Sequence, residues 1–113
     1  MLHSMMETAH TRRTADVESA LDVLSDDYAC RILTTLDDGP MGAADLAEAC
    51  GMSRATAYRR LERLGDVGFV ATEMSYDADG HHRKRFHLAL DELHLEVGPQ
   101  GVDGSVSLAR PAD

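Results

Sequence analysis

The chain has 113 residues, of which 43% are hydrophobic, so it has room for one domain of ordinary size with a modest core and not for two. Its formal net charge is −9 at pH 7, and its two cysteines are too few for the disulfide framework of a small secreted protein. No apolar run is long enough to cross a bilayer, and the first residues lack the apolar segment of a secretory signal, so we expect a cytoplasmic protein without a membrane anchor.

The first third of the chain predicts a tail followed by two amphipathic helices. Residues 1–14 are mostly polar, and we expect them to form a flexible tail. Helices are predicted over residues 16–24 and 26–36, with Ser25 as the N-cap of the second. Apolar residues at helical spacing mark the two buried faces, which comprise Val17, Ala20, Leu21 and Leu24, and then Tyr28, Ala29, Ile32, Leu33 and Leu36.

Residues 44–64, with the sequence ADLAEACGMSRATAYRRLERL, predict two helices that meet at a sharp turn. Gly51 stands where a left-handed residue ends the first helix, because without a Cβ it adopts this conformation at low cost. Ser53 offers its hydroxyl as the cap of a helix over residues 53–66. The buried face of this helix is Ala57, Leu61 and Leu64, and the other face carries Arg54, Thr56, Arg59 and Arg63. This geometry is typical of a recognition helix that enters the major groove of DNA.

The second half of the chain predicts two β-hairpins. Residues 69–76 and 83–90 are rich in strand formers and flank the turn sequence DADG, and Met41 is expected to add a very short strand. A second hairpin is predicted from residues 93–97 and 105–108. Helices followed by a hairpin make an α+β winged helix-turn-helix, here with an additional C-terminal β-hairpin. The expected parts are a tail over residues 1–14, a winged-helix DNA-binding domain over 15–90, and a hairpin and tail over 91–113 that offer a dimer contact.

The distribution of charge reconciles an acidic chain with DNA binding. Residues 53–88 carry seven basic and five acidic side chains, so this segment is positive by two while the remainder is at −11. Lys84 is the only lysine, and aspartate outnumbers glutamate. This composition resembles the acidic, lysine-poor surface of proteins from extreme halophiles. Molar salt would limit electrostatic repulsion of DNA to about 3 Å, so the acidic surface would matter less there than in dilute buffer.

The stretch YACRILTTLDDGPMGAADLAEACGMSRATAYRRLERLGDVGFV, followed by a charged hairpin, resembles the winged helix-turn-helix regulators of the ArsR-like group, particularly archaeal ones. The resemblance covers roughly residues 16–90. It implies a homodimeric transcription regulator that binds double-stranded DNA, with the helix over residues 53–66 in the major groove and a wing over residues 76–85 on the backbone or in the minor groove.

Two departures from this group are visible. Metal-sensing members carry paired cysteines at the start of the first turn helix, whereas this chain has Met41-Gly42-Ala43-Ala44-Asp45, so that thiolate site cannot form. The group's C-terminal dimer helix is also missing. We therefore expect the C-terminal hairpin, together with the first helix, to support the dimer.

The candidate DNA contacts lie on the recognition helix and on the wing, and they comprise Ser53, Arg54, Thr56, Tyr58, Arg59, Arg60, Arg63, His81, His82, Arg83, Lys84 and Arg85. Arginine and threonine suit base edges and phosphates. The alternatives are a solvated helix face for the arginines, packing for Tyr58, an ion pair with an acid for Arg60, and a charged edge that discourages strand pairing for the wing.

The histidines and cysteines are candidates for metal binding and redox chemistry. His81, His82, His87 and His94 cluster in the sequence, but no spacing matches a structural zinc site, so we expect no metal and no cofactor. Cys50 precedes the turn glycine, and we expect it to be a small core residue. Cys30 lies off the buried face of its helix, beside Arg31, and a partly ionised thiol there would be a redox switch. An unreactive cysteine at a helix or dimer contact is the alternative.

Two other classes of function are alternatives to DNA binding. A winged helix can serve as a protein interaction module of the transcription or replication machinery, and fold alone does not exclude this. An enzyme is not expected, because the chain has no nucleophile constellation, no phosphate-cradling loop and no paired-carboxylate pocket. The sequence thus predicts a transcription regulator whose effector, a small molecule or a redox signal, is open.

Overall fold

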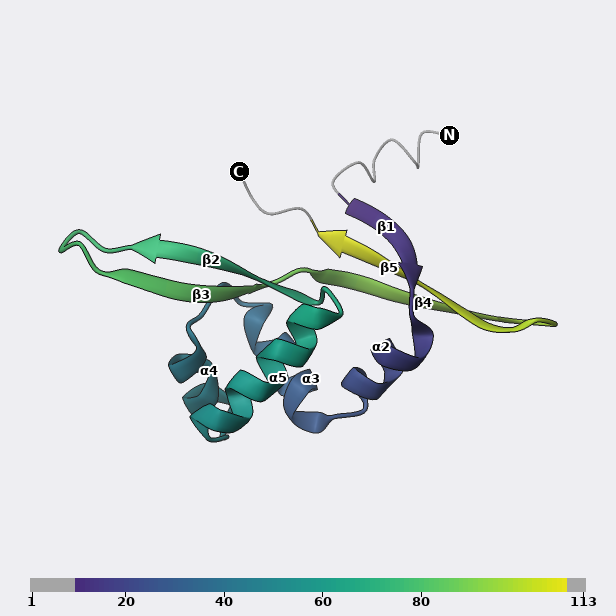
Figure 1. Ribbon diagram of the computed structural model, residues 1–113, viewed down its shortest axis with the longest axis horizontal. Coiled ribbons are helices and arrows are strands. Elements are labelled where there is room, and N and C mark those ends of the chain that lie inside the picture. The colour runs from purple at the N-terminus through teal and green to yellow at the C-terminus, as the bar shows by residue number, and fades with distance from the viewer. Residues whose placement is uncertain (1–9, 110–113) are drawn as a thin grey trace.

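The structure, a computed structural model, describes residues 10–109, with side chains described over residues 16–107. This part of the chain forms four helices on one side of two β-hairpins, which extend toward opposite ends of the long axis (Figure 1). The elements in order are β1 (His10–Ala15), α2 (Val17–Leu24), α3 (Asp27–Leu36), α4 (Ala43–Cys50), α5 (Arg54–Asp66), β2 (Val70–Tyr76), β3 (His82–Leu88), β4 (Leu90–Gly98) and β5 (Gly101–Ala109). The predicted α+β winged helix-turn-helix with an additional C-terminal hairpin is confirmed.

The strands form two antiparallel sheets. The wing is the pair β2–β3, and the second sheet has the order β1-β5-β4. Ala89 alone separates β3 from β4, and the backbone N–H groups of Ala89 and Leu90 both donate to the Phe69 carbonyl, at 2.9 and 3.0 Å. This shared acceptor fixes the point where the chain passes from one sheet to the other. Met41 forms the predicted short strand as an isolated bridge with Phe86.

Side chains cap three of the four helices. Asp16 accepts from the Ser19 N–H at the start of α2, Asp26 accepts from the Tyr28 N–H at the start of α3, and Ser53 accepts from the Thr56 N–H at the start of α5. The Ser19 hydroxyl also donates to Asp16 and lowers the pKa of that carboxyl, so the cap is charged at neutral pH and is lost when acid protonates it.

Ser25 as the N-cap of the second helix was a wrong prediction. It is the C-cap of α2, and its hydroxyl donates to the Asp22 carbonyl, while Asp26 caps α3. A carboxylate one residue later satisfies the free N–H groups and also complements the positive end of the helix dipole.

One hydrophobic core joins the helices to both sheets. Its fully buried large side chains are Phe69, Ile32, Leu36, Leu46, Leu61 and Leu64. The predicted stripe of the first helix is wrong in part, because Leu21 is 45% exposed and Val23 is buried. The helix turns Ala20 and Val23 inward because it packs on α3 and β5 together. Tyr28 also lies at the edge of the core, 37% exposed.

The N-terminal region differs from the predicted flexible tail. Residues 10–15 form β1, which pairs with β5 from His10 opposite Ala109 to Ala15 opposite Gly104. β5 would otherwise leave a row of backbone donors and acceptors open on that side, and β1 satisfies them. The remainder of the predicted tail, residues 1–9, lies outside the described residues. The sheet thereby joins residues on both sides of the predicted domain boundary at 90/91, and Val106 belongs to the common core.

Gly104 lets α2 pack closely on β5. A Cβ added at Gly104 would lie 2.8 Å from Val17 Cγ2 and 3.2 Å from Leu95 Cδ2. Since the branched Val17 side chain has little freedom to move, we expect Gly104→Ala to lower the free energy of unfolding by about 1–3 kcal/mol. Chemical denaturation measures this loss. Gly98→Ala is the matched control, because nothing lies within 4 Å of its added Cβ, and an equal loss there would contradict the close-packing argument.

Candidate nucleic-acid interface

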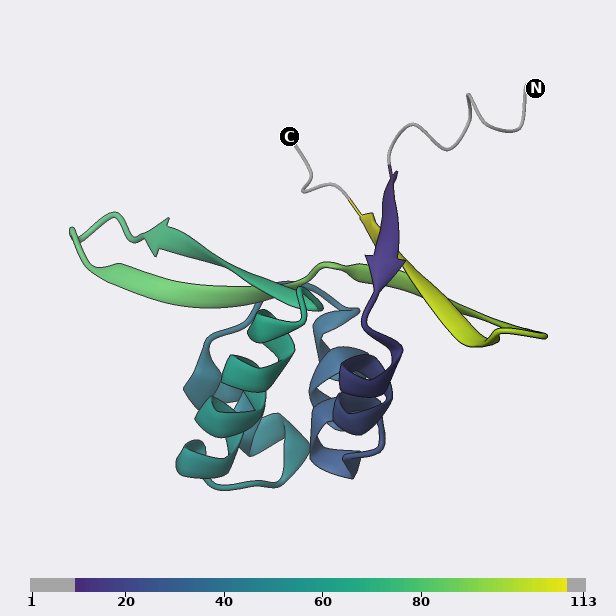
Figure 2. The same ribbon diagram turned by 45° about the vertical axis from the view of Figure 1, so that its right-hand side comes forward.

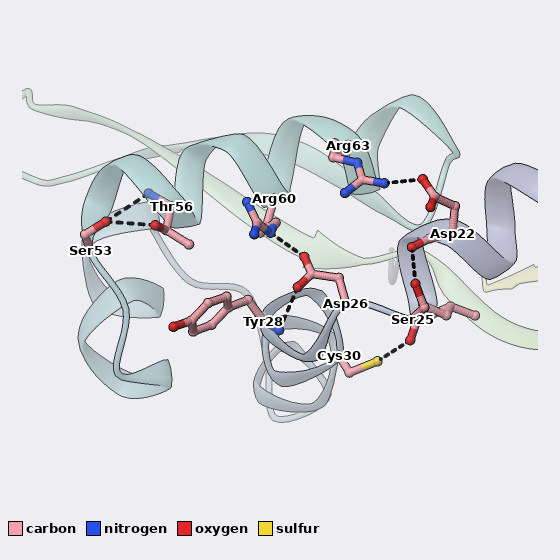
Figure 3. Close-up of polar contacts among 10 residues, drawn as sticks. Asp22, Ser25, Asp26, Tyr28, Cys30, Ser53, Thr56, Arg60 and Arg63 are labelled. Carbon is pink, nitrogen blue, oxygen red and sulfur yellow. Dashed lines mark hydrogen bonds and ion pairs between the residues drawn. The ribbon is translucent and has the colours of Figure 1, made fainter.

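The turn between α4 and α5 has the geometry that the sequence predicts. Gly51 is left-handed at φ 68°, and the Met52 N–H donates back to the Ala47 carbonyl at 2.9 Å, which closes the end of α4. Ser53 Oγ then accepts from the Thr56 N–H at 3.1 Å and contacts Thr56 Oγ1 at 3.0 Å (Figure 3). The hydroxyls of Ser53 and Thr56 are therefore engaged with each other at the start of α5.

The buried stripe of α5 is Ala57, Leu61 and Leu64, as predicted. Arg54, Tyr58 and Arg59 lie on the solvent side, and Tyr58 is 56% exposed. Within the described part of the chain, neither Arg54 nor Arg59 makes a side-chain hydrogen bond or an ion pair. Their guanidinium groups are therefore available to a ligand without the loss of an internal contact.

Arg60 and Arg63, in contrast, are directed toward α2 and the start of α3 (Figure 3). Arg60 Nε forms an ion pair with Asp26 Oδ2, and both side chains are mostly buried, at 25% and 18% exposed. Arg63 donates to Asp22 Oδ2 at 2.6 Å in a more exposed pair. The structure thus contains the ion pair with an acid that was the alternative to DNA contact for Arg60. The two arginines fix the rotation of α5 on α2 and α3.

Tyr28 completes this junction between α3 and α5. The guanidinium carbon of Arg60 lies 5.7 Å from the centre of its ring, and that of Arg31 lies 5.4 Å away. Both distances are within the range of a cation–π contact. The amphipathic spacing of its helix predicts a core role for Tyr28, but the structure places the ring between cations at the surface.

The basic run of the wing is held partly by internal contacts. Arg83 Nε donates to Asp77 at 2.9 Å, and Arg85 donates to the Pro40 carbonyl at 2.7 Å. His81 contacts Asp79 at 2.9 Å, and the His82 ring meets the Tyr76 ring edge-on, with 4.5 Å between their centres. Lys84 is exposed, and its ammonium lies 5.4 Å from the centre of the Phe86 ring.

An open groove separates the wing from α4 and α5. It has a volume of about 690 Å³, and its lining includes Tyr58 of α5, Lys84 of β3 and the residues that begin α4. Gly42 provides no side-chain cap for α4, and residues 42–45 line this groove. Residues 42–45 were not among the candidate contacts. The absence of a capping residue at Gly42 and Ala43 is the sequence signal that could have found them.

One cluster of possible metal ligands occurs in the described residues, at the tip of the wing. Single ligand atoms of Asp77, Asp79 and His81 lie within 4.8 Å of one another. Arg83 and His81 already satisfy the two carboxylates, and the guanidinium beside Asp77 opposes a second cation there. The other histidines of the sequence cluster, His82, His87 and His94, do not join this group.

The two cysteines line one shallow pocket of about 360 Å³ between α3 and α4. Cys50 is buried, as predicted, and its sulfur lies 3.4 Å from Thr35 Oγ1. Cys30 is half-buried, and its thiol donates to the Leu24 carbonyl at 3.1 Å. The expected neighbour of this thiol, Arg31, instead pairs with Asp27 at 2.8 Å and donates to the Cys50 carbonyl.

Comparison with known families agrees with this geometry. Residues 24–73 match a family model described as a helix-turn-helix domain. The chain contains a helix-turn-helix domain. The matched region runs from the last residue of α2 into β2, so it includes α3, α4, α5 and the arginines of α5.

A curated protein is similar over more of the chain. The "HTH-type transcriptional regulator NmtR" of Mycobacterium tuberculosis (strain ATCC 25618 / H37Rv) is 29% identical over 104 residues, which cover 78% of this chain and 87% of that protein. The helix-turn-helix domain and this similarity support a DNA-binding transcription regulator, a class that is typically not enzymatic. No helix in residues 10–109 is long and apolar enough to span a membrane.

Proposed function

We propose that this chain is a sequence-specific transcription regulator of the ArsR-like group that binds double-stranded DNA as a homodimer. In this proposal α5 lies in the major groove, and the wing, residues 76–85, contacts the adjoining backbone or minor groove. The helix-turn-helix match and the similarity to a transcriptional regulator support the proposal. The acidic composition with a single lysine supports a halophilic archaeal source.

The proposal rests on a difference among the arginines of α5. Arg60 and Arg63 pair with acids of the same chain, whereas Arg54 and Arg59 face solvent without a partner in the described residues. A guanidinium without an internal partner retains its donors for guanine or phosphate. We assign base reading to Arg59 and backbone contact to Arg54.

The remaining candidates take supporting roles. Tyr58 and Lys84 line the groove beside the start of α4, where their side chains suit a phosphate of the DNA backbone. Ser53 caps α5 and donates its hydroxyl to Thr56, and Arg60 and Arg63 orient the helix, so DNA contact by Ser53, Arg60 or Arg63 would cost an internal bond. The wing would add affinity for DNA with little sequence specificity, through His81, His82, Arg83 and Arg85.

A twofold dimer would present two copies of α5, so the operator should be a pseudo-palindrome whose half-sites lie one helical turn or a multiple apart. The test is selection of genomic fragments by the purified chain in high potassium chloride. Enrichment of promoter fragments that share an inverted repeat is expected. Absence of any enrichment would reject sequence-specific binding and favour the alternative, a protein interaction module of the transcription or replication machinery.

Regulation through Cys30 is a separate part of the proposal. The Cys30 thiolate would attack one oxygen of hydrogen peroxide, so that a sulfur–oxygen bond forms, the oxygen–oxygen bond breaks and hydroxide leaves. The product is a sulfenic acid. This larger polar group would disturb the hydrogen bond to the Leu24 carbonyl. Peroxide is therefore expected to weaken operator binding by the parent chain and not by Cys30→Ser, as measured by fluorescence anisotropy. If peroxide weakens both equally, Cys30 is not the sensor.

A further inference from the structure

One edge of β3, at the base of the wing, contacts the segment that precedes α4. The Phe86 N–H donates to the Met41 carbonyl at 2.7 Å, and the Met41 N–H donates to the Phe86 carbonyl at 3.0 Å. Toward the wing tip, a Cβ added at Gly42 would lie 3.7 Å from the Lys84 carbonyl oxygen. Residues 40–42 therefore run beside the base of the wing, and they lead directly into α4.

Arg85 adds a side-chain contact between these two parts of the chain. Its guanidinium donates to the Pro40 carbonyl at 2.7 Å, and no backbone N–H in residues 10–109 donates to that carbonyl. In the run of residues 81–85, Arg85 is half-buried, whereas the other four side chains are exposed. Glu73 is directly opposite Arg85 on β2, but no ion pair joins these two described residues. The guanidinium is thus directed away from the partner strand and toward the segment before α4.

The neighbouring cations of β3 make no such connection. Arg83 and Arg85 are two residues apart, so their side chains lie on the same face of the strand. Arg83 donates to Asp77 at 2.9 Å, a contact that stays within the wing, and its side chain is 69% exposed. Lys84 points to the other face and has no ion pair in the described part of the chain. Of these three described side chains, only that of Arg85 connects the wing to the segment before α4.

We propose that Arg85 is a positioning residue, which holds the wing against residues 40–42 so that Lys84 reaches the DNA backbone while α5 lies in the major groove. This inference rests on the proposed function and adds to it the means by which the wing is oriented. A wing that is already fixed in the free protein loses less conformational entropy when it binds. The Arg85–Pro40 hydrogen bond thus contributes to affinity through Lys84.

The shape of the wing makes its orientation sensitive to contacts at its base. The outer part of the wing extends past the helices in both views (Figures 1 and 2). Strands of seven residues are about 23 Å long at roughly 3.3 Å per residue, so a rotation of about 10° at the base moves the tip by about 4 Å. A displacement of this size is enough to break the hydrogen bonds that wing side chains would make to phosphates.

A positioning role and a direct phosphate contact predict different couplings between residues. A guanidinium has five donors, so the bond to Pro40 leaves others for phosphate. If Arg85 contacted phosphate independently, the losses caused by Arg85→Ala and Lys84→Ala would add. If Arg85 positions the wing, the contribution of Lys84 depends on Arg85, and the two losses do not add.

The test is a set of double-mutant cycles on the full chain, with affinity for the operator measured by fluorescence anisotropy in high potassium chloride. Lys84→Ala is expected to weaken binding of the parent at least about threefold more than it weakens binding of Arg85→Ala. Arg59→Ala, on α5, should weaken both by the same factor. Arg83→Ala is the matched control, because it removes the same charge from the same face of β3, and its loss should add to that of Lys84→Ala.

Hydrogen exchange of the free protein tests the contact in the absence of DNA. The backbone N–H groups of Met41 and Phe86 should exchange at least about fivefold faster in Arg85→Ala than in the parent, because their bridge opens more often. They should exchange at the parent rate in Arg83→Ala. Unchanged exchange within α5 in both variants would show that the opening is local and that both variants are folded.

Three results would overturn the positioning role of Arg85. They are additive losses for Arg85→Ala and Lys84→Ala, a Lys84→Ala variant that binds the operator like the parent, and parent exchange rates at Met41 and Phe86 in Arg85→Ala. A parent that selects no operator would instead reject the proposed function, and the exchange rates alone would then decide whether Arg85 holds the wing.

Discussion

Arg59→Ala is expected to weaken binding to the operator by about tenfold or more while binding to unrelated DNA changes little. Arg59 is exposed on α5 and has no ion pair in the described residues, so its removal should not change the fold. A bidentate contact between arginine and guanine contributes about 1–3 kcal/mol of discrimination against the wrong base. Fluorescence anisotropy with operator and scrambled duplexes in the same salt measures both losses.

Lys84→Ala is the matched control for this experiment. Lys84 is exposed on the wing, and its ammonium would contact phosphate, which is common to every sequence. The control should weaken both duplexes similarly and reduce the dependence of affinity on salt by about one unit of slope. Equal losses on both duplexes for Arg59→Ala would show that Arg59 contacts the backbone and would refute its base-reading role.

The local parts of this fold could be predicted from the sequence because their signals lie within a few residues. Gly51 ends α4 in the left-handed conformation, and Ser53 caps α5 three residues before the N–H that it binds. The turn DADG separates the wing strands for the same reason, since chain reversal there depends on the turn residues themselves. These elements are determined by conformational preferences that a sequence displays directly.

The partners of α5 could not be predicted in the same way. Asp26 and Arg60 are 34 residues apart in the chain, and Asp22 and Arg63 are 41 apart. Helical spacing placed Arg63 on the face opposite the core and Arg60 near it, but it did not say which acid each would meet. An exposed arginine without an internal partner and one that pairs with an acid of another helix therefore look alike in the sequence, and only tertiary packing separates Arg59 from Arg60.

The strand β1 was missed for a related reason. Its sequence HTRRTA has no apolar alternation, and its strand conformation depends on β5, which begins about 90 residues later. A strand is stabilised by its partner's backbone more than by its own propensity. The exposed position of Leu21 has the same origin, because contact of α2 with β5 as well as α3 decides which residues point inward.

The largest effect on stability is expected at Asp26. Its carboxylate caps α3 through the Tyr28 N–H and pairs with Arg60, and the two side chains are only 18% and 25% exposed. Asp26→Ala removes the cap, worth about 1 kcal/mol, and leaves a mostly buried guanidinium without its partner. We expect the free energy of unfolding to fall by about 2–4 kcal/mol, as measured by urea denaturation in high potassium chloride.

Two variants separate the terms of this loss. Asp26→Asn keeps a good N-cap but loses the charge, so it should retain about 1 kcal/mol of what Asp26→Ala loses. Asp22→Ala breaks the exposed pair with Arg63 and should cost no more than about 1 kcal/mol. If Asp22→Ala costs as much as Asp26→Ala, burial does not decide the strength of these pairs. Because Asp26 and Arg60 pair the start of α3 with α5, Asp26→Asn is also expected to weaken binding to the operator, as measured by fluorescence anisotropy.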